Sequence, residues 1–423
     1  MSSPPTTYFL ETLGCPKNQV DSDKLEGTLA ADGLTPVGSA GEADVVVVNT
    51  CAFIGEARQE SIETILSLSD QRRDGARLVV TGCLAERHGD EIAAELPEID
   101  QVAPFGAAIS TGVATAVPVS LGPTRRAPDF DLLNLPRPAS VRPWAYVKIA
   151  EGCDRACGFC AIPTFRGPQR SRSIEQIVEE VDQLEAKEIV LVAQDLAAFG
   201  RDQGVGERQI IPLVEQVAER VDWVRLLYLY PSDLGDPLID AICATGVPYF
   251  DLSLQHVSRP LMRRMRRWGD SERFLARIDA IRERTPDASF RSNFIVGYPG
   301  ETEADHDALL DFVEAAELDW CGFFAYSPEA GTYAMELDGP VDPDLRDERL
   351  AELRELQDDI TAAKRDLLVG SQVRVLVDEP GVARSHREAP EIDGVIHVPD
   401  SLRVGEFHDV TITAALGPDL EAS

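Results

Sequence analysis

The sequence predicts an α/β protein in three parts: an N-terminal open parallel sheet, a central partial (β/α) TIM-like barrel and a small C-terminal OB-like antiparallel β-barrel. Short β-branched runs alternate with helical segments over most of the 423 residues, which is typical of parallel α/β sheets. Short alternating stretches follow the last long helix and indicate the small barrel. We expect domains at 1–103, 144–369 and 370–423, with a proline-rich linker at 104–143.

The N-terminal domain repeats one arrangement three times, in which a β-branched run ends at a cysteine. The pairs are Tyr8–Gly14 with Cys15, Val45–Thr50 with Cys51, and Leu78–Gly82 with Cys83. Helices are predicted at 22–31, 56–70 and 89–95. Because ligands of open parallel sheets lie beyond the carboxyl ends of the strands, we expect the three thiols to converge at one edge. Three converging thiolates suit an iron–sulfur cluster, and three unrelated core cysteines are the alternative.

The central domain alternates strands and helices six times. Strands are predicted at 145–150, 188–193, 224–230, 249–254, 289–296 and 322–326, and helices at 173–186, 212–221, 237–244, 271–284 and 303–316. A complete TIM barrel repeats this unit eight times, so the pattern predicts an open, partial barrel. The chemistry of such barrels belongs at the carboxyl ends of the strands.

A second group of cysteines follows the first barrel strand. Cys153, Cys157 and Cys160 have the spacing C-x-x-x-C-x-x-C. A structural zinc site takes four ligands, whereas three thiolates can hold a 4Fe–4S cluster and leave one iron open; a zinc knuckle or a chance cluster is the alternative. The spacing, with Phe159 before the last cysteine, resembles the signature of radical S-adenosylmethionine (SAM) enzymes. That resemblance implies that the open iron binds SAM and reduces it to a 5′-deoxyadenosyl radical.

The later strands end in polar or glycine-rich stretches that supply candidate SAM contacts. The stretch 295–301 resembles the I-x-G-x-x-G-E element that lies along the adenine side of SAM in radical SAM barrels. Gln194 and Asp195 stand where many members carry the Gly-Gly-Glu that holds the SAM amine. The candidate SAM-binding residues are Gln194, Gln255, Ile295 and Gly297. Ordinary loop and capping chemistry is the alternative. Three further residues are expected to be structural: Cys243, His256 and Cys321.

The composition indicates a cytoplasmic protein. No run of about eighteen apolar residues suggests a membrane span, and the first seven residues lack the features of a signal peptide. Eight cysteines in this setting suggest metal or redox chemistry rather than disulfides. The net charge of −33 favours a basic partner over free RNA, although a uniformly acidic proteome would produce the same composition. Five arginines within 259–267 form either an RNA contact or a solvated face.

The C-terminal part begins with an amphipathic helix predicted at 344–368. Alternating stretches at 372–378, 394–398 and 406–414 follow it, and their position resembles the TRAM domain, an OB-like module often used to bind RNA. Residues 370–423 carry ten acidic and four basic side chains, a net charge of −6. That balance suits a basic protein better than phosphate.

Across nearly the whole chain, these three parts together resemble the methylthiotransferase family of radical SAM enzymes. The resemblance implies an auxiliary 4Fe–4S cluster on Cys15, Cys51 and Cys83, beside a catalytic, SAM-binding 4Fe–4S cluster on Cys153, Cys157 and Cys160. The run 14–18, Gly-Cys-Pro-Lys-Asn, is similar to the branch that modifies a ribosomal protein; the tRNA branch typically has Gln-Met after that cysteine.

The resemblance also implies the reaction. The radical removes a hydrogen from the β-carbon of an aspartate in ribosomal protein S-twelve, and a methylated sulfur joins that carbon, with two SAM molecules consumed. The implied partners are that protein or the small ribosomal subunit and an electron donor, with no membrane and with RNA contact secondary. Two alternatives remain open: a tRNA adenosine methylthiotransferase, and a non-catalytic iron–sulfur RNA-binding scaffold.

Overall fold

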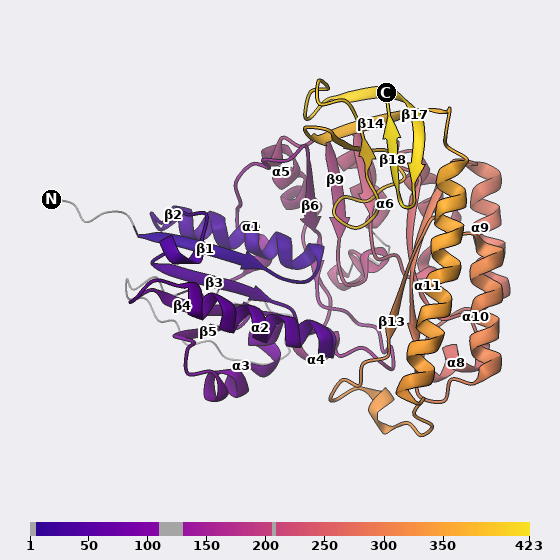
Figure 1. The fold of residues 1–423 in the computed structure, drawn as a ribbon. Helices are drawn as coiled ribbons and strands as arrows, with labels where there is room; N and C mark the ends of the chain where they lie inside the picture. Colours follow the sequence, from indigo (N-terminus) through magenta and orange to yellow (C-terminus); the bar gives the residue numbers. More distant parts are fainter. Residues whose placement is uncertain (1–5, 110–129, 205–208) are drawn as a thin grey trace.

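The computed structural model describes residues 6–109, 130–204 and 209–423 (Figure 1). Half of the predicted linker, residues 110–129, therefore lies outside the described residues, as do residues 1–5. Figure 1 shows the N-terminal domain beside the central barrel and the C-terminal barrel over one end of it. Within the described ranges, the search for a helix long and apolar enough to cross a bilayer finds none.

The N-terminal domain is a parallel sheet in the order β2-β1-β3-β4-β5. All residues of the central strand β3 are buried, because helices cover both faces of a parallel sheet. The elements are β1 (Thr7–Thr12), α1 (Pro16–Ala31), β2 (Thr35–Pro36), β3 (Val45–Thr50), α2 (Gly55–Gln71), β4 (Arg77–Gly82), α3 (Cys83–Glu95) and β5 (Gln101–Ala103). The predicted open parallel sheet is confirmed.

Two helices of this domain begin earlier than predicted. Helix α1 starts at Pro16 instead of Ser22, because proline at the first helical position is already preset for helix and has no N–H to lose. Helix α3 starts at Cys83, although its backbone is kinked at His88. The kink interrupts the helical pattern, so only the part after it is visible in the sequence.

The central domain is a partial barrel of six parallel strands. The sheets β6-β9-β10 and β11-β12-β13 are joined through a single bridge between Leu229 and Leu252. The strands are β6 (Trp144–Lys148), β9 (Glu188–Val192), β10 (Trp223–Leu226), β11 (Tyr249–Gln255), β12 (Ser289–Val296) and β13 (Trp320–Ala325). The helices of the repeat are α5 (Ile174–Leu184), α6 (Ile210–Ala218), α7 (Asp236–Cys243), α9 (Ser271–Arg284) and α10 (Glu303–Ala316). Short elements complete the domain: β7 (Ala150–Glu151), α4 (Ile162–Phe165), β8 (Arg170–Ser171) and α8 (Arg259–Arg264).

Side-chain caps account for the predicted helix starts in the barrel. Ser173 and Gln176 form a capping box at α5, and Thr302 and Asp305 form another at α10. Each capping side chain satisfies a backbone N–H that the first helical turn leaves unpaired. These helices form the outer layer of the domain and pack against strands that are buried on both faces.

The C-terminal barrel covers the amino ends of the central strands. It is closed in the order β14-β15-β16-β18-β17, and Arg384 of this barrel and Arg225 of β10 both pair with the fully buried Glu188 at the start of β9. Helix α11 (Pro343–Asp366) precedes this barrel, whose strands are β14 (Gln372–Glu379), β15 (Val382–Arg384), β16 (Ile396–His397), β17 (Phe407–Leu416) and β18 (Asp419–Ala422). The opposite end, where the strands terminate, therefore stays available for chemistry.

Helix α1 lies against the open side of the barrel. Its Val20 belongs to the same buried cluster as Tyr146 of β6, Val192 of β9 and Leu227 after β10. Lys24, farther along the helix, donates to the carbonyl of Leu133 at 2.6 Å and pairs with Glu180 of α5 at 3.2 Å. The helix that begins beside Cys15 is thus part of the barrel's own packing.

A second set of ion pairs connects the far side of the N-terminal domain to the barrel. Arg58 of α2 and Arg87 of α3 both pair with Glu329, which is 3 % exposed and follows β13. Ser327 donates to Glu329 at 2.6 Å and accepts from the N–H of Gly55 at 3.0 Å. Helices α2 and α3, which begin after Cys51 and at Cys83, are therefore connected by ion pairs to the segment after the last strand of the barrel.

Candidate active site

The three N-terminal cysteines lie at one edge of their sheet. Strands β1, β3 and β4 are adjacent and parallel, Cys51 directly follows β3, and Cys83 directly follows β4. A Cβ on Gly14 would lie only 2.8 Å from the Cβ of Cys51 and 3.0 Å from its Sγ. Since Gly14 also has φ +97°, which favours glycine, the backbone before Cys15 can pass over Cys51 only with glycine at this position.

Asn18 connects the cysteine loops. Its side chain is fully buried, and its Nδ2 donates to the carbonyls of Leu13 at 2.9 Å and Thr50 at 3.0 Å. In turn Asn49 donates to the carbonyl of Asn18 at 2.9 Å. One amide therefore holds the chain before Cys15 and the chain before Cys51 at a constant separation.

The thiols of this edge lie within electrostatic reach of one another. Burial raises the pKa of Cys51 to about 12, and Cys83 and Cys15 add to the shift. Burial likewise raises the pKa of Cys83, although Arg166 opposes it. Cys15 differs: burial acts against ionisation, but Lys17 and Arg166 hold the pKa of this thiol below its ordinary value. These mutual effects place the three thiols near one another, and their role as cluster ligands stays a prediction.

The second triplet occupies the loop between β6 and α4, at the carboxyl end of the barrel. The N–H of Cys153 donates to the carbonyl of Gly167 at 3.1 Å, and that of Cys160 donates to the carbonyl of Cys157 at 3.2 Å. Burial raises the pKa of the Cys153 thiol to about 12 and that of Cys160 to about 11. The loop therefore presents mostly protonated thiols until a metal displaces the protons.

Gly158 allows this loop to pack between two other loops. Its N–H donates to the carbonyl of Met265 at 2.8 Å, and its own carbonyl accepts from the N–H of Ala334 at 2.8 Å. A Cβ here would lie 2.7 Å from the hydroxyl of Tyr298. The end of β12, which continues into Tyr298, therefore touches the cysteine loop.

Arginines surround the second triplet. Nη1 of Arg267 lies 3.2 Å from the Sγ of Cys157, and its guanidinium lies 4.3 Å from the ring centroid of Tyr230. Arg155 pairs with Asp195 and Asp233, which follow β9 and β10. Arg264 donates to the carbonyl of Pro299 at 2.8 Å. Part of the arginine run at 259–267 is thus built into the site, while its role toward RNA stays a prediction.

The two triplets are connected through Arg166, which directly follows α4. Its Nη2 lies 3.0 Å from the Sγ of Cys83 and 3.0 Å from Oδ1 of Asn18. Its Nη1 lies 2.8 Å from Oε1 of Glu151, which in turn accepts from Gln194 at 2.7 Å. One buried guanidinium therefore joins the edge of the N-terminal sheet to the loop of the radical SAM signature.

The predicted SAM contacts lie at the ends of their strands, and their role stays a prediction. Oε1 of Gln194 and Oδ1 of Asp195 are buried, and neither has a hydrogen-bond partner among the described residues. Gln255 ends β11 with φ +74°, an uncommon value for a residue with a side chain. Ile295 packs against the barrel core. Gly297 donates its N–H to Glu301 at 2.7 Å, and a Cβ at this glycine would lie 2.6 Å from Cγ of Arg346.

Sequence reasoning missed the polar residues that frame the cysteines. Arg155 lies within the segment of the second triplet and Asn18 lies three residues after Cys15. Their closeness to the cysteines in the sequence could have indicated a role in the site. Glu151 lies two residues before Cys153 and Arg267 belongs to the arginine run at 259–267, but their partners, like those of Arg166, come from distant segments that local patterns do not show. The search for three or more His, Cys, Asp or Glu side chains placed to hold a metal ion finds none in the described ranges.

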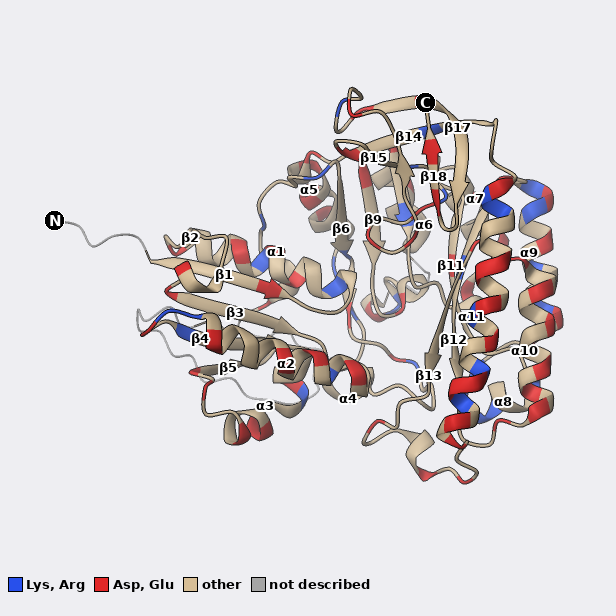
Figure 2. Ribbon diagram, viewed as in Figure 1, with Lys and Arg blue, Asp and Glu red and all other residues tan. Residues whose placement is uncertain are grey.

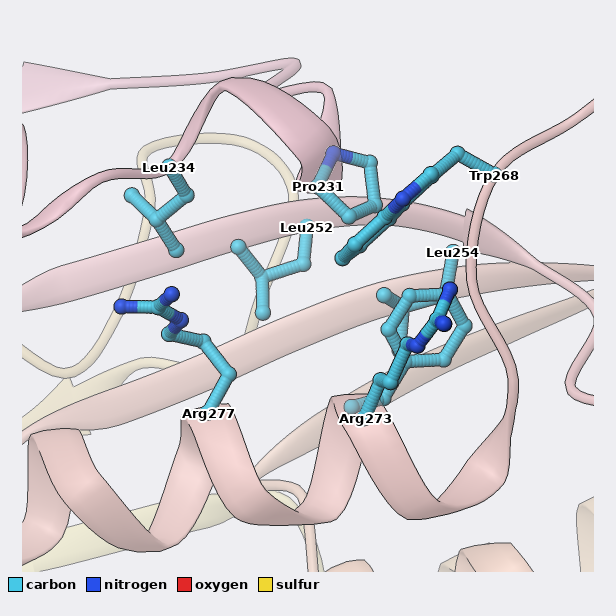
Figure 3. A pocket seen from close by; sticks show the side chains of 8 residues that line it. Pro231, Leu234, Leu252, Leu254, Trp268, Arg273 and Arg277 are labelled. Carbon is cyan, nitrogen blue, oxygen red and sulfur yellow. The ribbon is translucent and has the colours of Figure 1, made fainter.

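A small apolar hollow of about 20 Å³ lies outside the site, between strand β11 and helix α9 (Figure 3). It is lined by Pro231, Leu234, Leu252, Leu254, Trp268, Arg273, Phe274 and Arg277. Figure 3 shows both arginines rising from one helix beside the apolar side chains. The cysteines of the two triplets do not line this hollow, so we assign it no role in the chemistry.

Three family models match the chain. They are the uncharacterized protein family UPF0004 at residues 7–104, the radical SAM superfamily at 147–313 and the TRAM domain at 369–423. The structure of the methyltransferase TsrM from Kitasatospora setae is similar at a TM-score of 0.49, with 15% identity, over 79% of this chain and 78% of that one. Together with the fold and the signature cysteines, the family models define a radical SAM enzyme, which uses SAM and a 4Fe–4S cluster.

Curated relatives show to which family of radical SAM enzymes the chain belongs. Proteins called ribosomal protein uS12 methylthiotransferase RimO are 41% identical in Cutibacterium acnes, over 98% of this chain and 97% of the relative, and 42% identical in Moorella thermoacetica, over 92% and 91%. The protein of that name in Thermotoga maritima is 40% identical, over 95% and 96%. The chain belongs to the RimO family of radical SAM methylthiotransferases. This membership confirms the predicted family, fold class and enzyme class.

Proposed function

We propose that this chain attaches a methylthio group to the β-carbon of an aspartate in ribosomal protein uS12, with two 4Fe–4S clusters and two SAM molecules. The observation that supports it best is the link through Arg166 between the Cys15, Cys51 and Cys83 edge and the radical SAM loop. A sulfur source and a radical source must act on one carbon, so their binding sites must be neighbours.

The donor sets fit two clusters. Each site offers three thiols and no competing disulfide, since all eight cysteines are free, and soft thiolates are the ligands of iron–sulfur clusters. Cys153, Cys157 and Cys160 would hold the cluster that binds SAM, and Cys15, Cys51 and Cys83 the auxiliary cluster. Because burial raises the pKa of Cys51, Cys83, Cys153 and Cys160, loading must release protons.

The unpaired acceptors beside the radical SAM loop fit the SAM amine. Asp195 is 4 % exposed, and its Oδ1 has no hydrogen-bond partner among the described residues. Its charge raises the pKa of Cys153, which places it close to that thiol. A buried acceptor without a donor costs free energy, and an ammonium group would satisfy it. Asp195 and Gln194 would therefore hold the amine that Gly-Gly-Glu holds in other radical SAM enzymes.

The chain's own residues orient the reactants and exclude water. When bound, the clusters and SAM supply a 5′-deoxyadenosyl radical and the sulfur that is transferred. Arg267 offsets negative charge on the sulfur of Cys157, and Arg155 is held in place by Asp195 and Asp233. The buried cluster of Tyr146, Val192 and Leu227 keeps the barrel interior dry. Removing hydrogen from an unactivated carbon requires no general base, which agrees with a site dominated by sulfur and arginine.

Surface charge supports a basic protein as the substrate. Six acidic side chains of the C-terminal barrel are exposed, against two basic ones: Glu379, Glu391, Asp400, Glu406, Asp409 and Glu421, with Arg374 and Arg403. Figure 2 shows acidic and basic residues interspersed on the outer helices α9 and α11. Phosphate backbones bind through positive charge, so the surface of the C-terminal barrel favours a ribosomal protein over tRNA. RNA contact is then secondary, through the TRAM domain, and the reaction proceeds in the cytoplasm with an external electron donor.

Anaerobic reconstitution tests the proposal. We expect about eight irons per chain, for two clusters, and 5′-deoxyadenosine from added SAM. Ribosomal protein uS12, the small ribosomal subunit and tRNA are then offered side by side, and mass spectrometry locates the methylthio group. Modification of the ribosomal protein supports the proposal. Modification of tRNA alone would replace it with the tRNA reaction, and about four irons per chain would remove the auxiliary cluster.

Single cysteine variants separate the role of the SAM-binding cluster from the role of the auxiliary cluster. Cys157→Ala should abolish SAM cleavage, because it removes a ligand of the SAM-binding cluster. Cys51→Ala should leave part of the SAM cleavage and stop sulfur insertion. Cys243→Ala, at a cysteine outside both triplets, is the matched control and should retain both activities. Normal sulfur insertion by Cys51→Ala would show that the auxiliary site is misassigned.

A further inference from the structure

Lys17 is the exception among the five lysines of the chain. The other four each pair with a carboxylate: Lys24 with Glu180, Lys148 with Asp21, Lys187 with Asp222 and Lys364 with Asp319. The Nζ of Lys17 contacts the ring of Tyr228 and has no carboxylate partner among the described residues. An ammonium without a counter-charge is unusual in a chain with 73 acidic residues.

The start of helix α1 and the ring of Tyr228 together position Lys17. It is the second residue of α1, immediately after Pro16 and beside Cys15. Its Nζ lies 3.4 Å from the ring centroid of Tyr228, which follows β10 at the carboxyl end of the barrel. Tyr228 has φ +65° and is held by its N–H, which donates to Asp251 at 2.9 Å. Such backbone strain in a non-glycine residue is concentrated at functional sites.

Most other cations around the two triplets pair with carboxylates, whereas Arg267 contacts the sulfur of Cys157 and the carbonyl of Ser253. Arg166 pairs with Glu151, Arg155 with Asp195, and Arg87 with Glu329. A cation over an aromatic ring keeps most of its capacity to bind an anion, because the ring carries no net charge. Lys17 is thus a half-buried ammonium beside the thiol of Cys15, whose pKa it lowers, and it has no carboxylate partner among the described residues.

We propose that Lys17 binds the side-chain carboxylate of the substrate aspartate and that Tyr228 positions its ammonium. This inference rests on the proposed function. The carbon to be modified is bonded directly to that carboxylate, so an ion pair with Lys17 holds the reacting carbon beside Cys15, at the edge assigned to sulfur. It also selects the substrate class: an adenosine base has no carboxylate, and an asparagine offers only a neutral oxygen, which forms a weaker hydrogen bond with a cation.

The test compares two forms of one substrate. Reconstituted enzyme is mixed anaerobically with labelled ribosomal protein uS12, either with its target aspartate or with asparagine in that place, and the dissociation constants are measured by fluorescence anisotropy. We expect wild type to bind the aspartate form at least about tenfold more tightly, as for a hydrogen bond to a charged group. Lys17→Met should bind the two forms within about twofold of each other, mainly through weaker binding of the aspartate form.

Four further variants make the result specific to Lys17 and the ring of Tyr228. Lys17→Arg keeps the charge and should retain part of the preference. Tyr228→Phe keeps the ring and should retain it, whereas Tyr228→Leu should reduce it. Lys187→Met removes the same charge at the opposite end of the barrel, next to Glu188, and should leave the preference unchanged.

Several outcomes would overturn the inference. If Lys17→Met weakens both forms equally, Lys17 only offsets charge on the Cys15 edge. If it keeps the full preference, another group binds the carboxylate. If Lys17→Met loses its iron, the two forms of the substrate are compared with Tyr228→Leu instead. A preference of Tyr228→Leu for the aspartate form equal to that of wild type then contradicts the proposal. Failure of the proposed function looks different, because wild type then modifies neither form of the ribosomal protein.

Discussion

The guanidinium of Arg166 lies 3.0 Å from the sulfur of Cys83, although the two residues are 83 positions apart in the sequence. Arg166 follows the helix that closes the radical SAM loop, and Cys83 begins a helix of the N-terminal domain. The same guanidinium pairs with Glu151 at 2.8 Å. A single buried cation therefore sets how the two cysteine triplets lie relative to each other.

Replacing this cation should destabilise the whole chain. In Arg166→Met, buried Asp21 and partly buried Glu151 keep Lys148 but lose their second cation, so we expect the unfolding free energy to fall by about 3 kcal/mol, at the low end for broken buried pairs. Urea denaturation of the apo chain under argon measures it. Arg170→Met is the matched control, since its pair with Asp131 is partly exposed and contributes less than about 1 kcal/mol. Equal losses in the two variants would contradict the assigned role.

Arg267 should tune the cluster of the radical SAM loop. Its Nη1 lies 3.2 Å from the sulfur of Cys157, and a nearby positive charge favours the more negative, reduced form of a cluster. We expect Arg267→Met to shift the midpoint potential to more negative values, measured by potentiometric titration with EPR detection. Arg263→Met, at an exposed position of the same arginine run, should not shift it. A potential unchanged in both variants would separate Arg267 from the cluster.

Glu329 should couple the two half-reactions. It accepts from Arg58 and Arg87, which belong to the helices after Cys51 and Cys83. In Glu329→Gln the interactions with Arg58 and Arg87 weaken. We therefore expect methylthio transfer to fall more than SAM cleavage, because cleavage requires only the radical SAM loop. The ratio of methylthiolated product to 5′-deoxyadenosine measures the coupling. Glu63→Gln, on the exposed face of α2, is the control. An unchanged ratio in Glu329→Gln would show that the ion pairs of Glu329 with Arg58 and Arg87 have no part in the coupling.

His256 should make stability depend on pH. Burial lowers its pKa to about 4 from the ordinary 6.5, although Asp305 opposes the shift, and its Nδ1 accepts from the N–H of Ser258 at 3.1 Å. The folded state binds fewer protons than the unfolded state between these values. The unfolding free energy should therefore fall by about 3 kcal/mol as the pH drops from 6.5 to 4.

Denaturation at several pH values tests this expectation. His256→Asn keeps an acceptor for Ser258 and has no titrating ring, so the slope of stability against pH should flatten in this window. His397→Asn, at an exposed histidine, should leave the slope unchanged. A slope that persists in His256→Asn would assign the effect to other groups.

Local patterns allowed most of the fold to be predicted. The strands Val45–Thr50 and Ser289–Val296 and the helices Ser271–Arg284 and Glu303–Ala316 have the predicted bounds, because burial on both faces, or an explicit cap, is written into neighbouring residues. The short strands β2, β5, β15 and β18 were missed. Their place in a sheet depends on partners elsewhere in the chain, which residue patterns do not reveal.

The sequence by itself determined the family, the two cysteine triplets and their placement after parallel strands, because motif spacing and periodicity are local properties. Only the tertiary structure decided that Arg166 reaches Cys83, that Glu329 holds two helices of the other domain, and that the C-terminal barrel covers the amino ends of the strands. It also decided that Lys17 lies over the ring of Tyr228 with no carboxylate partner among the described residues, although each of the four other lysines has one. Ion pairs between distant segments form through packing of the whole chain, so their partners cannot be read from neighbouring residues.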